Sequence, residues 1–441
     1  MSRRSALAAG LLVLLACALL GSLEAWARRR PDAAPDREEL SLLWLLDERP
    51  AFPCGPDGTC STDPELRLLD VPERRFSREP AAGTVRIVCV GDSTTAGWPY
   101  HPRGGYPEWM AQMLPHLLPG RSFEVLNLGV HGWDGPRIEA AAREALSLRP
   151  HALVMRLGYN DAPYVLLRTP PGGALGRLRL KAFKALIRSS AAFRLASRAS
   201  GRPRTGGGRG LLQPPGRLTP AKIAQVTASH RERLGRLVAQ ARAAGAAPVL
   251  LGMPFSKVVV RGAWRGEALA EQAAATRDAA AELGAAFAPL TDVRGDTRFI
   301  DDLHPDDEGY RLTALGALAA LQAAGVPGLK ERWRWDRLRA PAFYAAKLML
   351  DEPDYRTHLD ARLAFFFTRV GMRERAERHM TAAVAGAPNP DMVPEDVRTV
   401  GREDCAALYR EAFSRLYRAG RASAPRQPAN RVLAGLPERS E

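Results

Sequence analysis

Ser93 stands at the kind of turn where an enzyme places a nucleophile. Residues 85–90 (VRIVCV) are mostly apolar, as in a buried strand, and Gly91-Asp92-Ser93 follows them directly. Ligands of open α/β sheets bind at the carboxyl ends of the strands, where this hydroxyl would lie. A serine hydroxyl becomes a nucleophile only when a base removes its proton and hydrogen-bond donors stabilise the oxyanion. The rest of the chain has to supply that base and those donors.

The sequence Asp301-Asp302-Leu303-His304 supplies a base together with a partner for it. Asp301 and His304 are three residues apart, so a single turn brings both side chains to one face. A carboxylate there accepts the imidazole N–H, fixes the tautomer and favours the imidazolium that forms in catalysis. We interpret the acidic residues 306–308 that follow as the first turn of a helix, and expect no metal and no cofactor.

Two further turns supply hydrogen-bond donors at the same edge of the sheet. Gly132 follows the second predicted strand and has no Cβ, so its N–H can approach a substrate oxygen closely. Gly158-Tyr159-Asn160-Asp161 follows the third strand, and the amide of Asn160 is a side-chain donor. With the N–H of Ser93, these groups give three donors for an oxyanion.

Strand and helix patterns alternate from residue 85 to residue 325, which is typical of a parallel sheet covered on both faces. After the first strand, the pattern predicts strands over 123–128, 152–156, 248–251 and 285–289. It predicts helices over 106–118, 137–148, 220–244, 266–283 and 306–324. Residues 164–219 interrupt the alternation as an insertion. Its basic amphipathic part, 175–200, suits a membrane surface, a lid over the site or an ordinary packed helix.

These residues resemble the four sequence blocks of the SGNH, or GDSL-type, esterase/lipase superfamily. The blocks are Gly91-Asp92-Ser93, Gly132, Gly158-Tyr159-Asn160-Asp161 and Asp301-Asp302-Leu303-His304, in the family's order. The resemblance covers roughly residues 85–325 and implies a flavodoxin-like three-layer α/β/α fold. It implies that Ser93 is the nucleophile, His304 the base and Asp301 its orienting partner. It also implies an oxyanion hole made by Ser93, Gly132 and Asn160. The G-x-S-x-G elbow of α/β-hydrolases is absent.

The N-terminal part of the chain points to export. In residues 1–27, two arginines precede an apolar run over 6–23, as in a signal peptide or a membrane anchor, and both interpretations stay open. Residues 28–82 are rich in proline and charge, and we expect them to form a spacer. Cys54 and Cys60 lie within it at a spacing that allows a small disulfide loop, which would suit an oxidising compartment.

The C-terminal part is predicted to be helical. We divide the remaining chain into a hydrolase domain over 83–326, an all-α extension over 327–423 and a loose tail over 424–441. Apolar residues from Leu363 to Pro388 match the spacing of one tetratricopeptide repeat. A convincing second copy is lacking, and such repeats need at least three units to stand alone. A helical extension packed on the hydrolase domain and a module for a protein partner both stay open.

The net charge of +15 is almost all arginine, and no basic block is interleaved with aromatic residues, which argues against nucleic-acid binding. An acidic substrate or an anionic membrane surface fits the charge better. We therefore expect a serine ester hydrolase that acts outside the cytoplasm, through an acyl-enzyme, on a lipid or an acylated glycan. One alternative is an O-acyltransferase that modifies an envelope or extracellular polysaccharide. The other is a non-catalytic scaffold protein that uses the helical module.

Overall fold

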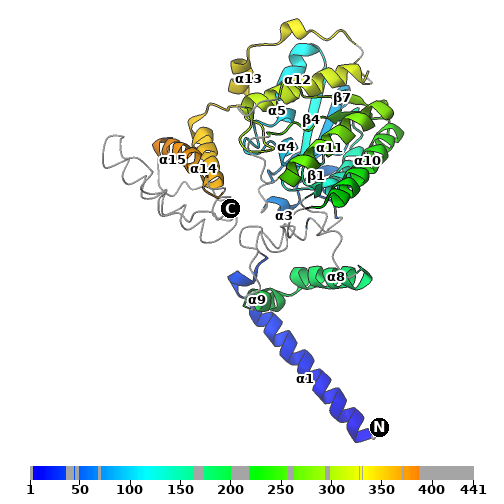
Figure 1. The fold of residues 1–441 in the computed structure, drawn as a ribbon. Coiled ribbons are helices and arrows are strands. Elements are labelled where there is room, and N and C mark those ends of the chain that lie inside the picture. Colours follow the sequence, from blue (N-terminus) through cyan, green and yellow to red (C-terminus); the bar gives the residue numbers. More distant parts are fainter. Residues whose placement is uncertain are drawn as a thin grey trace. The chain divides into compact units, whose positions relative to one another are not determined.

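The computed structural model describes residues 3–386, apart from 36–43, 45–48, 68–70, 163–172, 200–217, 257–262, 294–297, 327, 330 and 370–371. The chain divides into two compact units (Figure 1). The smaller consists of Met1–Asp47 and Leu166–Pro214, and the larger of Glu48–Val165 and Pro215–Glu441. The predicted tail, the end of the helical extension and both ends of the insertion lie outside the described residues.

The larger unit is built on a five-stranded parallel sheet with the strand order β4-β3-β5-β6-β7. This order is that of flavodoxin-like doubly wound folds, with a switch point between β3 and β5. All residues of β3 after Thr84 are buried, which explains its apolar sequence. Each predicted strand overlaps an observed one; these are β3 (Thr84–Gly91), β4 (Ser122–Gly129), β5 (Ala152–Arg156), β6 (Ala247–Leu251) and β7 (Ala286–Ala288).

Helices cover both faces of this sheet (Figure 1). On one face, α5 packs against α12, and on the other, α10 lies between α6 and α11. Apolar side chains of β3 that include Ile87 and Cys89 pack into the core on the α5 and α12 side. The three-layer α/β/α fold is therefore confirmed. The helices are α5 (Tyr106–Leu117), α6 (Gly135–Leu146), α10 (Pro220–Ala243), α11 (Ala263–Glu282) and α12 (Asp307–Ala323).

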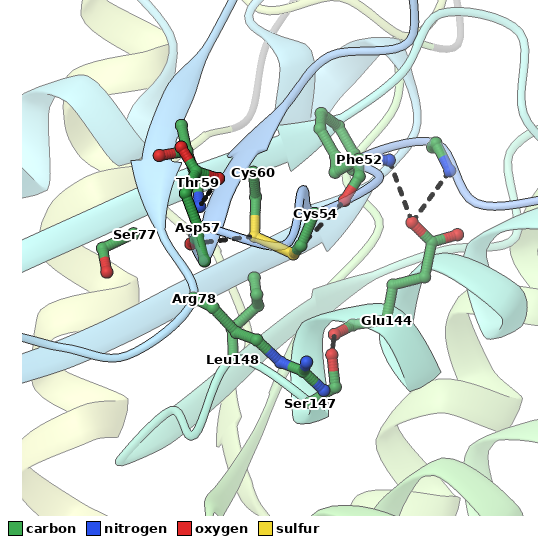
Figure 2. Close-up of a disulfide and its surroundings, with 12 residues drawn as sticks. Phe52, Cys54, Asp57, Thr59, Cys60, Ser77, Arg78, Glu144, Ser147 and Leu148 are labelled. Atoms are coloured by element: carbon green, nitrogen blue, oxygen red, sulfur yellow. Dashed lines mark hydrogen bonds between the residues drawn. A yellow bond between two sulfur atoms is a disulfide. The ribbon is translucent and has the colours of Figure 1, made fainter.

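The described residues 49–67 and 71–82 belong to the larger unit and carry secondary structure, so they are not a spacer. They form β1 (Thr59–Ser61), α3 (Pro64–Arg67) and β2 (Arg75–Ser77), and the two strands pair antiparallel. A disulfide joins Cys54 to Cys60 at the turn that leads into β1 (Figure 2). The predicted spacer over 28–82 is thus wrong for this segment.

The physical reason is that the hydrolase domain binds the backbone of this segment. Glu144 of α6 accepts hydrogen bonds from the N–H groups of Ala51 and Phe52, at 2.8 and 3.0 Å (Figure 2). The buried guanidinium of Arg86 in β3 donates to the carbonyl of Ser77 at 2.9 Å, and also to that of Arg78. A segment that is held by polar contacts to its backbone needs no periodic apolar pattern in its sequence. The proline- and charge-rich composition therefore indicated a linker.

After α12 the chain continues into helices that share the core of the hydrolase domain. Helices α14 and α15 pack against each other. Their buried side chains, among them Phe367 and Met380, belong to the same apolar cluster as Ile87 of β3. The extension is therefore part of the larger unit. Its elements are η3 (Trp335–Arg337), α13 (Pro341–Lys347), α14 (Pro353–Arg369) and α15 (Arg373–Gly386).

The smaller unit joins the N-terminal helix to the insertion. Glu24 of α1 (Arg3–Arg28) accepts hydrogen bonds from the N–H groups of Ala191 and Ala192, at 3.0 and 3.1 Å. These bonds lower the pKa of Glu24 to about 2. Arg194 donates to the carbonyl of Ala33 at 2.6 Å. The carboxylate thus caps the first turn of an insertion helix; the insertion forms α8 (Gly173–Ser189) and α9 (Ala191–Ala199).

Among the described residues, we find no helix with the length and apolar character needed to span a membrane.

Candidate active site

Ser93 begins a one-turn helix, α4 (Ser93–Ala96), at the carboxyl end of β3. The buried carboxylate of Asp92 caps this helix, since it accepts the N–H of Thr94 at 2.9 Å and its hydroxyl at 2.7 Å. The end of β4 lies directly against the turn, where a Cβ on Gly129 would be 2.2 Å from the backbone nitrogen of Ala96. Only glycine allows this approach, so Gly129 fixes how closely β4 supports the Ser93 turn.

One chain of hydrogen bonds links Ser93, His304 and Asp301. His304 Nε2 lies 2.7 Å from Ser93 Oγ, and its Nδ1 lies 2.7 Å from Asp301 Oδ2. The other oxygen of Asp301 accepts the N–H groups of Leu303 and His304, at 2.8 and 2.7 Å. Because a carboxylate only accepts, the Nδ1 atom carries the proton and Nε2 is free to accept from the serine hydroxyl.

The charges of this pair favour a protonated imidazole and an ionised carboxylate. Burial works to lower the pKa of His304, but the charge and hydrogen bond of Asp301 outweigh it and raise the pKa above its ordinary value. Burial in turn works to raise the pKa of Asp301, while His304 lowers it below the ordinary value of an aspartate. Asp301 therefore stabilises the protonated form of His304.

The three predicted donors come from three strand ends. The N–H groups of Ser93 and Gly132 have no backbone acceptor within the described part of the chain, and Gly132 has a left-handed backbone with φ of +70°. Asn160 Nδ2 donates to the carbonyl of Trp133 at 3.0 Å. An amide carries two N–H groups, so Asn160 retains a second one. Its bond to Trp133 ties the loop after β5 to the loop that holds Gly132.

Asp161, which completes the third block, has a positioning role that its place in the block does not reveal. Its buried carboxylate accepts the N–H of Gly135 at the start of α6 and pairs with Arg233 Nη1 of α10 at 3.1 Å. Gly135 follows Gly132 by three residues. Asp161 therefore fixes the start of the helix that ends the Gly132 loop.

Two further aromatic residues, one beside His304 and one packed on the first, were not predicted. The indole of Trp98 lies 4.6 Å from the imidazole of His304, measured between ring centroids, and Phe366 of α14 lies 4.8 Å from the same indole. Neither belongs to a motif, and Phe366 is far from the site in sequence. His101 and His131, which lie near the site in sequence, contact each other edge-on at 4.6 Å.

The acidic residues that follow His304 serve the helix they begin. Asp306 caps α12 by accepting the N–H of Gly309 at 2.6 Å, and Glu308 pairs with Arg311. In the described ranges, no group of histidine, cysteine, aspartate and glutamate side chains has the arrangement of a metal site.

Residues 89–312, about half of the chain, match the family model of the GDSL-like lipase/acylhydrolase family. The chain belongs to this family. Because the family is one of lipases and acylhydrolases, the protein is an ester-hydrolysing enzyme. The match contains Ser93, Gly132, Asn160, Asp301 and His304.

Solved structures resemble this GDSL-like hydrolase at low sequence identity. A lipase/acylhydrolase from Enterococcus faecalis is 17% identical, with 58% of this chain and 100% of that chain covered and a TM-score of 0.36. An alpha/beta hydrolase enzyme from the metagenome of Lake Arreo is 17% identical, with 54% and 96% covered and a TM-score of 0.35. An acetylxylan esterase from Geobacillus stearothermophilus is 15% identical, with 54% and 94% covered and a TM-score of 0.34. No curated protein matches the chain in sequence.

Proposed function

We propose that this GDSL-like hydrolase cleaves carboxylic esters through an acyl-enzyme formed on Ser93. The observation that carries the proposal is the continuous hydrogen-bond chain from Ser93 through His304 to Asp301, with 2.7 Å at both contacts of the imidazole. Ser93 Oγ attacks the ester carbonyl while His304 Nε2 takes its proton. The imidazolium then gives this proton to the departing alcohol oxygen, which leaves the acyl group on Ser93.

Water completes the cycle by the same route. His304 takes a proton from a water molecule that attacks the acyl-enzyme, and returns it to Ser93 Oγ as the carboxylic acid leaves. In both steps a negative charge develops on the former carbonyl oxygen. The N–H groups of Ser93, Gly132 and Asn160 are the donors for that oxygen. One such donor typically contributes about a hundred- to a thousand-fold in rate.

A fluorophosphonate probe tests this proposal directly. It should add a single phosphonyl group per chain, and peptide mapping should place that group on Ser93. Labelling should slow as the pH falls through the pKa of His304, because the protonated imidazole cannot accept the serine proton. The Ser93→Ala variant should take up no probe. Labelling at another residue would mean that Ser93 is not the nucleophile. No labelling of the folded wild type would contradict the acyl-enzyme and favour the scaffold alternative.

We also propose that the enzyme works outside the cytoplasm, at a membrane surface to which the smaller unit binds. The Cys54–Cys60 disulfide supports an oxidising compartment. All but two of the exposed large apolar side chains in the described part lie in the smaller unit, on α1 and α8. On α8, Leu178 and Leu186 are exposed beside Arg179 and Lys181, a combination that suits anionic lipid headgroups.

Vesicle sedimentation of the full chain tests the membrane proposal. Binding should be stronger to vesicles of phosphatidylglycerol and phosphatidylcholine than to phosphatidylcholine alone, and added salt should weaken it. Replacing Leu178 and Leu186 together with serine should lower the partition coefficient by about ten-fold or more. Phe343→Ser, at an exposed residue of α13 in the larger unit, is the control. Equal binding of the double variant and the wild type would exclude α8 from the membrane contact.

A further inference from the structure

The indole of Trp98 is placed to act on the charge of His304. The two rings lie 4.6 Å apart between centroids, with an angle of 57° between their planes. A cation within about 6 Å of an indole centroid is attracted by the negative face of the ring. His304 becomes such a cation each time it takes a proton from Ser93 or from water. The indole can therefore stabilise the charged form of the base in addition to Asp301.

The C-terminal extension holds Trp98 in this place. Phe366 of α14 packs against the indole at 4.8 Å, with the ring planes at 67°. Arg362, also of α14, donates to the carbonyl of Pro99 at 2.6 Å. From the hydrolase domain, the hydroxyl of Tyr310 donates to the carbonyl of Trp98 at 2.6 Å. Both the indole ring and the backbone that carries it are thus held in part by α14.

A second link joins the extension to the loop of His304. Arg375 of α15 donates to the carbonyl of Ile300 at 2.7 Å. The N–H of Ile300 in turn donates to the carbonyl of His304 at 2.9 Å, across the turn that contains Asp301. Helices α14 and α15 therefore contact both loops that meet at the imidazole.

We propose that α14 and α15 are part of the catalytic apparatus of this enzyme. In this proposal, Trp98 is a positioning residue that orients His304 and stabilises its imidazolium, and Phe366 keeps the indole in place. The proposal rests on the proposed function, since it requires His304 to act as the base. It gives the extension a role within its own chain, which recruitment of a protein partner would not require.

Substitutions that separate the π face from simple packing test this inference. Trp98→Leu keeps an apolar cover over His304 but has no ring, and should lower kcat by about 3- to 30-fold with little change in KM. The acid limb of the pH–rate profile should move to lower pH, because the imidazolium loses a stabilising partner while burial remains. Trp98→Phe keeps an aromatic face, so its kcat and acid limb should lie close to those of the wild type. Phe366→Leu should lower kcat less than Trp98→Leu does.

A purely structural role of Trp98 would not move the acid limb. A control variant shows whether losing any aromatic contact in the extension lowers kcat. Phe343→Leu changes an aromatic residue of the same extension that packs on His116 and Tyr344, away from the site, and should leave kcat unchanged. Thermal unfolding of every variant shows whether it is folded. Wild-type kcat and acid limb in folded Trp98→Leu would overturn the inference.

NMR titration of the full chain, with histidine labelled at Cε1, distinguishes this outcome from failure of the proposed function. A pKa of His304 that falls in Trp98→Leu supports the contact between indole and imidazolium, whether or not the wild type cleaves esters. An unchanged pKa in an active enzyme overturns the inference and leaves the proposed function intact.

Discussion

Replacing Ser93 with alanine is expected to reduce kcat on p-nitrophenyl esters by about ten-thousand- to a million-fold. The reason is that the alanine side chain has no oxygen to form the acyl-enzyme, while His304, Asp301 and the oxyanion donors stay in place. The residual rate reflects those remaining groups acting on water. The measurement is a series of initial rates on esters from acetate to long acyl chains, with wild type and variant side by side. The chain length that the wild type prefers then narrows the substrate class.

The matched control is Ser147→Ala, which removes an exposed hydroxyl at the end of α6. It should behave as the wild type, so that a loss in Ser93→Ala is attributable to the site. If Ser93→Ala keeps more than a small fraction of wild-type turnover, another group must be the nucleophile.

Replacing Asp301 with asparagine is expected to lower kcat by about a thousand- to ten-thousand-fold. An asparagine oxygen can still accept the N–H groups of Leu303 and His304, so the loop should keep its shape. Its amide nitrogen, however, donates toward Nδ1 of His304. This favours the tautomer with the proton on Nε2, which cannot accept the proton of Ser93.

Asp301→Asn should also shift the acid limb of the pH–rate profile, in a direction set by the charges around His304. Asp301 raises the pKa of His304 above its ordinary value of 6.5, so the wild type should lose kcat/KM as the pH falls through a value above 6.5. Without the negative charge of Asp301, burial lowers the pKa of His304 against only the smaller opposing effects of Asp302 and Asp92. The acid limb of Asp301→Asn should therefore lie at lower pH than that of the wild type. Asp307→Asn, at an exposed residue in the first turn of α12, is the control and should not shift the limb.

The sheet and its helices could be predicted because each element has a local signature. β3 is buried on both faces and reads as an apolar run that ends at Gly91. α10 shows the helical recurrence of apolar residues. Parallel strands present their carboxyl ends at one edge, so polar residues just after three different strands are expected to meet there. The structure brings Ser93, Gly132 and Asn160 to the ends of β3, β4 and β5.

What the sequence did not reveal depends on contacts between distant segments. Phe366 reaches Trp98 only because α14 packs on the hydrolase domain, and no periodicity in either segment encodes that docking. The segment before β3 is held in part by Glu144, whose carboxylate accepts the N–H groups of Ala51 and Phe52. From the sequence alone, Glu144 is indistinguishable from any other charged residue on a helix surface. Asp161 was visible within a motif, but its partners Gly135 and Arg233 lie on other elements.

Because α14, α15 and β3 share one core, the family-matched segment cannot be exchanged between proteins without the extension that follows it. The match ends at residue 312, inside α12, whereas the apolar cluster continues to Ala383 of α15. A recombination event that exchanged only the matched segment with another GDSL-like enzyme would leave Phe366 facing a foreign loop in place of Trp98. It would also pair the foreign strands with an extension that had not varied together with them. We therefore expect the hydrolase domain and the helical extension to be inherited together. A homologous hydrolase domain should be transferable only with its own extension.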